Sequence, residues 1–277
     1  MNAITNENIY VVAQGGIGDL LQFLPFLIQN KNNNKIRIIL ASHQAATLQI
    51  LNHFKINPYA IYNYTTFDEL LILESKIREY SPIYSCPRSL FFDDIPFPPP
   101  AQDVKNSNPI VGIHLWGSQY SQNTALKFNT QPKTIPFDII NALAKLKINI
   151  LIFGSPNELD CIDDNFPFGN VKLLYKDNII ESLRHVAICD AVIAADSSIK
   201  TLSAMLKIPT LVFISDIDDK FRDENFINPY VQKSNMVTYE YSSLSNEKEF
   251  NIAKRFAYDF LNKILKLSDS NLNELNK

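Results

Sequence analysis

Short, wholly apolar segments of strand length recur along the chain, and each ends abruptly in small or polar residues. The strands expected from this pattern are Ile9–Ala13, Lys35–Ala41, Pro109–Leu115, Asn149–Phe153, Ala191–Ala195 and Thr210–Ile214, with shorter strands at Ser81–Cys86 and Asn170–Tyr175. Strands that are buried on both faces read as continuous apolar runs, and parallel strands need a crossover helix between them. The pattern therefore predicts an α/β fold with parallel sheets that are covered by helices on both faces.

Helices are expected between these strands, where apolar residues recur at helical spacing. A first helix follows the glycines after Ile9–Ala13, and the others are expected at His43–Phe54, Phe67–Tyr80, Phe137–Leu146, Ile179–Ile188, Ile199–Leu206 and about Asn246–Leu267. We expect Leu48 and Leu51 on the inner face of their helix, and a helix start at Thr66 or Phe67. In the last helix, the apolar stripe consists of Phe250, Ala253, Phe256, Phe260 and Ile264.

A proline-rich segment divides the chain into two halves. Pro96 and Pro98–Pro100 lie in a stretch that can be neither helix nor central strand, because proline lacks a donor and fixes φ. We predict an amino-terminal Rossmann-like domain at 1–92, a linker at 93–108, a carboxy-terminal Rossmann-like domain at 109–244, a helix at 245–267 and a tail at 268–277. That helix either crosses back to the first domain or packs on the second.

Composition excludes several classes of protein. The net charge of -3 and the pI of about 5.8 give no nucleic-acid footprint. No segment has the length of a membrane span or the build of a signal peptide. Cys86, Cys161 and Cys189 form no disulfide or metal-ligand pattern. We expect a cytoplasmic protein with at most peripheral contact at the inner membrane, no bound metal and no cofactor. His114 lies in an apolar strand and is expected in the core.

The loops after the strands carry the candidate functional residues, because ligands of such folds bind at the carboxyl ends of the strands. Gly15, Gly16 and Gly18 follow the first strand, and Asp19 then stands in the first turn of a helix. In the second half, the loops are Gly117–Ser118, Gly154–Ser155 and Asp196–Ser198. If two Rossmann-like domains turn these edges toward each other, the cleft between them is the active site.

Four segments resemble, in order, motifs of the heptosyltransferase family of bacterial glycosyltransferases, which is glycosyltransferase family nine. They are Gly18–Leu27, Gly117–Ser118 with Lys133–Pro136, Gly154–Glu158, and Asp190–Ser198 with Ile208–Thr210. The match spans nearly the whole chain, and its last segment is the most specific. The resemblance implies the GT-B fold, in which two Rossmann-like domains face each other across a cleft. It also implies inverting, metal-independent transfer of a sugar, usually from ADP-heptose, to a glycan, lipid-linked or protein acceptor.

The resemblance also implies a role for each matching residue. Asp19 would be the general base on the acceptor hydroxyl. Lys133 would hold the departing diphosphate, and the backbone at Ser197 and Ser198 would cradle phosphate. Asp196 would bind donor hydroxyls, Glu158 would bind the ribose, and Gly117 with Ser118 would complete the donor loop.

Several alternatives stay open at this point. Asp196 is also a good helix N-cap, Glu158 can be a solvated loop charge, and Lys127 competes with Lys133 for the phosphate. The family usually has glycine where Ser198 stands and histidine where Thr201 stands, and the amino-terminal half is short. Lys200 either supplies the positive charge instead or faces water. As whole-protein alternatives, we consider a degenerate sugar-nucleotide-binding module without catalysis and a sugar-nucleotide epimerase or hydrolase on the same fold.

Overall fold

The computed structural model describes residues 8–13, 17–41, 45–56, 61–79, 81–85, 108–116, 135, 137–154, 168–174, 178–215, 235–241 and 247–267. The chain divides into two compact units, which are Met1–Ile95 with Asn178–Ile180, and Pro96–Asp177 with Glu181–Lys277. The predicted linker, apart from Asn108, and the predicted tail lie outside the described residues. Among the described helices, none is long and apolar enough to cross a membrane.

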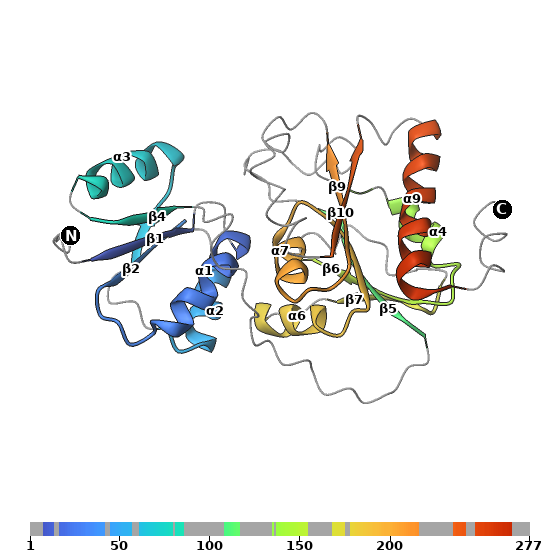
Figure 1. Ribbon diagram of the computed structural model, residues 1–277, viewed down its shortest axis with the longest axis horizontal. Helices are drawn as coiled ribbons and strands as arrows, with labels where there is room; N and C mark the ends of the chain where they lie inside the picture. The colour runs from blue at the N-terminus through green and yellow to red at the C-terminus, as the bar shows by residue number, and fades with distance from the viewer. Residues whose placement is uncertain are drawn as a thin grey trace. The chain divides into compact units, whose positions relative to one another are not determined.

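The amino-terminal unit is a parallel four-stranded sheet with the strand order β3-β2-β1-β4. Its elements are β1 (Ile9–Ala13), α1 (Ile17–Gln29), β2 (Ile36–Ala41), α2 (Ala45–His53), β3 (Ile61–Tyr64), α3 (Phe67–Arg78) and β4 (Ile83–Ser85). Helix α3 covers one face of the sheet, and α1 and α2 cover the other (Figure 1). Tyr10 and Val12 of β1 pack with Leu70 and Ile77 of α3, as the alternation of side chains along a strand requires.

The carboxy-terminal unit is a parallel six-stranded sheet with the strand order β10-β9-β8-β5-β6-β7. Its strands are β5 (Ile110–His114), β6 (Asn149–Phe153), β7 (Val171–Leu174), β8 (Ala191–Ala195), β9 (Thr210–Ser215) and β10 (Met236–Tyr241). Its helices are α4 (Phe137–Leu143), α6 (Ile179–Val186), α7 (Ser198–Met205) and α9 (Glu247–Leu265). Within this unit, α4 and α9 lie on one side of the sheet and α6 and α7 on the other (Figure 1).

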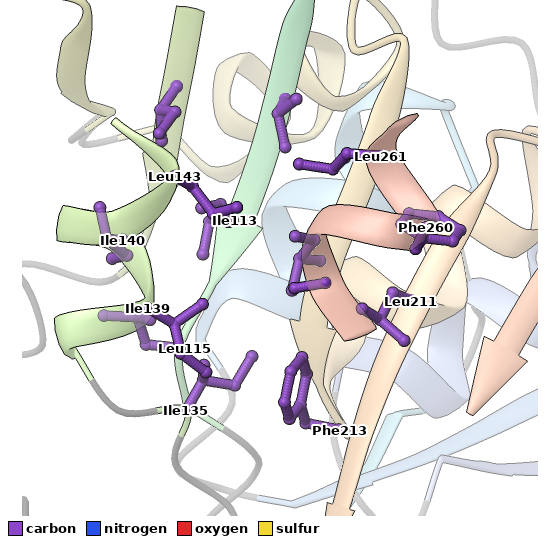
Figure 2. Close-up of a cluster of buried hydrophobic side chains, with 14 of the residues drawn as sticks. Ile113, Leu115, Ile135, Ile139, Ile140, Leu143, Leu211, Phe213, Phe260 and Leu261 are labelled. Atoms are coloured by element: carbon purple, nitrogen blue, oxygen red, sulfur yellow. The ribbon is translucent and has the colours of Figure 1, made fainter. Parts of the chain in front are cut away.

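A large cluster of buried apolar side chains lies between the second sheet and the helices α4 and α9. Figure 2 shows Ile113 and Leu115 at β5, Ile139 and Leu143 on α4, and Leu261 on α9 gathered in this cluster. The predicted stripe on the last helix is confirmed, since Ala253 and Phe260 are buried and Phe250, Phe256 and Ile264 pack against the cluster. Burial of this much apolar surface is what fixes the sheet and its loop edge in place.

Two close contacts fix the centre of this sheet. A Cβ on Gly112 of β5 would lie 2.8 Å from Cε2 of Phe153 and 2.9 Å from Sγ of Cys189, so glycine is required by close packing. The backbone N–H of Ile110 donates to Oδ2 of Asp190 at 2.8 Å, which ties the start of β5 to the start of β8. Strands β5 and β8 are therefore held side by side with little freedom to shift register.

The predicted α/β class and parallel sheets are confirmed, and the corrections concern edges and single residues. Strands β3 and β10 were not predicted, because they are short or half-polar edge strands without a continuous apolar run. Leu48 was expected on the inner face of α2 but is 42% exposed, while Ile50 and Leu51 are buried. The start of α3 is confirmed, with Thr66 as N-cap in a capping box with Glu69. Hydrogen bonds from the side chain and backbone of Thr65 and from Thr66 hold the pKa of Glu69 below its ordinary value.

Candidate functional site

The strand order of each sheet indicates where a ligand would bind. In the second unit, the first strand along the chain, β5, has β6 on one side and β8 on the other. The connections therefore reverse direction between β5 and β8, and the crevice at the carboxyl ends of such a pair is the usual ligand position in doubly wound folds. Strand β5 ends at His114 beside Ala194, one residue before the last residue of β8. Asp196 follows β8 directly, so it lies at this reversal.

Asp196, Ser197 and Ser198, all predicted to bind donor, are brought together at the start of α7. Ser197 is the N-cap, with φ -149° and ψ 174°, and its hydroxyl accepts a hydrogen bond from the backbone N–H of Lys200. The alternative in which Asp196 caps the helix is therefore wrong, because Ser197 occupies that position. Asp196 stands one residue outside the helix, and its carboxylate is not needed for capping.

The carboxylate of Asp196 is paired with the ammonium group of Lys200. Nζ of Lys200 donates to Oδ1 of Asp196, and the two side chains are only 7% and 15% exposed. The alternative that Lys200 faces water is therefore wrong. A buried pair loses its hydration, and removing one partner of such a pair costs about 3–5 kcal/mol.

A network of hydroxyl groups fixes the helix behind this ion pair. Oγ1 of Thr201 donates to the carbonyl oxygen of Ser197 at 3.4 Å, and Oγ of Ser203 donates to that of Lys200 at 2.9 Å. The hydroxyl of Thr210, on β9, donates to Oγ of Ser203 at 2.9 Å. Thr201, Ser203 and Thr210 are buried, so α7 presents a rigid amino-terminal turn to the strand edge.

The corresponding reversal in the amino-terminal unit lies between β1 and β4, and α1 begins just after β1. Gly18 and Asp19 are in the first turn of α1, and both are partly buried. One turn later, Nε2 of Gln22 donates to the carbonyl oxygen of Gly18 at 3.4 Å, and Gln22 is 4% exposed. Gln22 was not singled out in the sequence, although its spacing from Gly18 places both on one face of the helix.

Several predicted site residues lie outside the described residues. They are Gly15, Gly16, Gly117, Ser118, Lys133 and Glu158, together with the competing Lys127. His114 is in the core as expected, 8% exposed, with its ring in an edge contact with Trp116 at 6.4 Å. Burial raises the pKa of the Cys189 thiol. Within the described ranges, no three His, Cys, Asp or Glu side chains gather as they would around a metal ion.

Comparisons with known proteins agree with this architecture. No protein-family model and no curated protein matches the chain. Among solved structures, ADP-heptose LPS heptosyltransferase II from E. coli superposes with a TM-score of 0.55 at 14% identity, over 93% of this chain and 98% of the other. A family 9 glycosyl transferase from Veillonella parvula gives a TM-score of 0.50 at 11% identity, over 92% of this chain and 90% of the other. The resemblance inferred from the four sequence motifs is thus confirmed at the level of the fold.

Proposed function

We propose that this chain, with the fold of heptosyltransferase II, is an inverting, metal-independent glycosyltransferase. It would move a sugar, heptose or a related one, from a nucleotide-diphosphate donor to a hydroxyl acceptor. The observation that carries the proposal is the rigid start of α7 at the strand reversal, with Asp196 and two serines at the position where such folds bind ligand. The similarity to a protein named for ADP-heptose makes ADP the first nucleotide to test.

The donor would bind to the carboxy-terminal unit. Backbone N–H groups in the first turn of α7, at Ser198 and beyond, carry the positive end of the helix dipole and suit a diphosphate. Asp196 would accept hydrogen bonds from hydroxyls of the transferred sugar. From the sequence motifs, Lys133 would hold the leaving diphosphate, and Gly117, Ser118 and Glu158 would contact the rest of the nucleotide.

The acceptor would bind to the amino-terminal unit, in the loop of Gly15, Gly16 and Gly18. In our proposal, the two units face each other across a cleft, as in a GT-B enzyme. Asp19 removes the proton from the acceptor hydroxyl. The oxygen of that hydroxyl attacks the anomeric carbon of the donor sugar from the side opposite the diphosphate. The bond from that carbon to the diphosphate oxygen breaks as the new glycosidic bond forms, and the configuration inverts. The leaving diphosphate keeps the electron pair of the broken bond. The start of α7 and Lys133 stabilise its negative charge without a metal.

The acceptor would be a glycan, a lipid-linked sugar or a protein hydroxyl. A cytoplasmic enzyme with peripheral contact at the inner membrane would meet all three. The short amino-terminal half would give a small acceptor side. Neither the degenerate binding module nor the epimerase is favoured by a feature of the described residues.

A transfer assay tests the proposal directly. The wild-type protein is incubated with ADP-heptose, or with another nucleotide-sugar whose nucleotide binds, and with candidate acceptors, in the presence of EDTA. We expect release of nucleoside diphosphate that depends on the acceptor and continues with EDTA present. Release without an acceptor would indicate a hydrolase. Tight binding without release would favour the non-catalytic module, and loss of activity with EDTA would refute the metal-independent mechanism.

A further inference from the structure

Lys200 occupies a position that helix electrostatics disfavours. With Ser197 as N-cap and Ser198 as the first helical residue, Lys200 is the third residue of α7. The first turn of a helix already carries the positive end of the dipole, so a cation there is normally unfavourable. Lys200 is also buried, and like other buried lysines it is paired, here with Asp196. A buried cation in the first turn of a helix, at the ligand edge of a sheet, calls for a functional reason.

Asp196 offers that reason, because its charge would otherwise oppose the ligand. A carboxylate one residue before the helix start lies beside the place where a diphosphate would bind, and two anions at short range repel each other. The contact between Nζ of Lys200 and Oδ1 of Asp196 makes the pair neutral as a whole. The positive end of α7 then meets the ligand without a net opposing charge from this pair.

We propose that Lys200 is a positioning residue of the donor site: it holds and neutralises the Asp196 carboxylate, so that the start of α7 can take a nucleoside diphosphate. This inference rests on the proposed function and deepens it, since it gives a role to a residue outside the four sequence motifs. Lys200 acts here through Asp196 and not by touching the phosphate. The hydroxyl network from Thr210 to Ser203 keeps the lysine's own turn of helix in place behind the pair.

Three variants separate this role from its rivals, with ADP affinity measured by calorimetry without divalent metal. Lys200→Met removes the cation that pairs with the Asp196 carboxylate, and ADP should bind about ten-fold or more weakly. Asp196→Asn removes the anion and keeps the lysine charge, and ADP should bind at least as tightly as to the wild type. In the double variant Asp196→Asn/Lys200→Met both charges are absent, and the affinity should return to within about three-fold of the wild type.

Each rival predicts another pattern. If Lys200 contacted the phosphate directly, the double variant would bind as weakly as Lys200→Met. If the pair were merely structural, Asp196→Asn would lose ADP affinity as Lys200→Met does, since both variants lose stability. ADP carries no transferred sugar, so loss of the Asp196 contact to that sugar does not confuse the readout. Lys172→Met, at an exposed position on β7 of the same sheet, is the matched control and should bind ADP like the wild type.

The melting temperature of each variant is measured without ligand. If Lys200→Met does not fold, the charge-neutral double variant and Asp196→Asn still decide, since a loss of ADP affinity in Asp196→Asn overturns the inference. If the wild-type protein binds ADP and Lys200→Met binds it equally well, the role of Lys200 is overturned, while the proposed function still stands. If none of ADP, GDP, UDP and CDP binds the wild-type protein, both proposals are overturned.

Discussion

Two aspartates define the proposed chemistry at the scale of single residues, and the chain surrounds them differently. Asp196 lies outside its helix and is neutralised by Lys200. Asp19 lies inside the first turn of α1 and is partly buried, in a helix that has no basic residue in its last turn. A carboxylate in a first helical turn has an ordinary stabilising role, so its catalytic role has to be separated from that one by experiment.

For Asp19, we expect Asp19→Asn to keep donor binding and to lower turnover by roughly 10²–10⁴-fold, the usual contribution of a positioned base. Asparagine keeps the size and hydrogen bonding of aspartate but cannot accept the proton. Calorimetry and a transfer assay on the same preparation measure the two effects. Asp68→Asn is the matched control, since Asp68 is an exposed carboxylate in the first turn of α3 and should cost only about 0.3–1 kcal/mol of stability. Near-normal transfer by Asp19→Asn would leave Asp19 as a helix-start residue.

The packing of Gly112 gives a second prediction at this scale. Its added Cβ would meet Phe153 at 2.8 Å and Cys189 at 2.9 Å, so Gly112→Ala should destabilise the protein by about 1–3 kcal/mol through overpacking. Urea denaturation followed by circular dichroism measures this. Gly169→Ala is the control, because nothing lies within 4 Å of its added Cβ and no loss of stability is expected. Equal stability of the two variants would mean that β5 shifts easily, against the packing described here.

At the scale of elements, the ends of three helices are unusual. Helices commonly end with a glycine in the left-handed region, but this chain has only 7 glycines and uses lysine instead. Lys55, Lys207 and Lys266 have φ values of 55°, 58° and 52°. After α2 and α7, the next backbone N–H groups close the turn, from Ile56 to the carbonyl oxygen of Leu51 and from Ile208 to that of Ser203. The positive charge of lysine is favourable at the negative end of the helix dipole, but a left-handed φ is strained for any residue with a Cβ.

We expect Lys55→Gly to stabilise the protein by about 0.5–1 kcal/mol, since glycine relieves the left-handed strain at a small cost in chain entropy. Lys76→Gly makes the same change at an exposed position inside α3 and should instead cost about 1 kcal/mol. Chemical denaturation of both variants gives the comparison. Destabilisation by Lys55→Gly would show that the lysine charge outweighs the strain.

Elements with a continuous apolar run could be predicted from the sequence, and so could the start of α3, because burial and capping leave local signals. Strand β10 could not, since only its first and last residues, Met236 and Tyr241, are buried at the edge of the sheet. The choice of Ser197 over Asp196 as N-cap also escaped prediction. Both residues cap helices well, and the backbone angles that decide between them arise from packing. The ion pair of Asp196 with Lys200 has the right spacing in the sequence, but only the fold shows that it is buried.

At the scale of the whole molecule, the proposal that only the carboxy-terminal unit binds the donor predicts that nucleotide protects one segment from hydrogen exchange. At an ADP concentration of about 100 times Kd, hydrogen exchange in the segment from Ala191 to Met205 should slow by up to about 100-fold, because the ligand stabilises only the bound fold. Peptides from the first turns of α1 should exchange as before, and those from Val171–Leu174 serve as a control on the same sheet. Protection confined to the amino-terminal unit would contradict the assignment of the donor site.

The order of strands in the second sheet also has a consequence for synthesis of the chain. The start of β5 is bonded to Asp190, 80 residues later in the sequence, and β8 follows that residue. At typical translation rates of 5–20 residues per second, the ribosome needs roughly 4–16 s to deliver this partner. During that interval, β6 can occupy one edge of β5, but the other edge exposes unpaired backbone groups on an apolar strand. The nascent chain therefore passes through a stage of seconds in which this edge can pair with other chains, and we expect its yield to respond to chaperones and to the speed of translation.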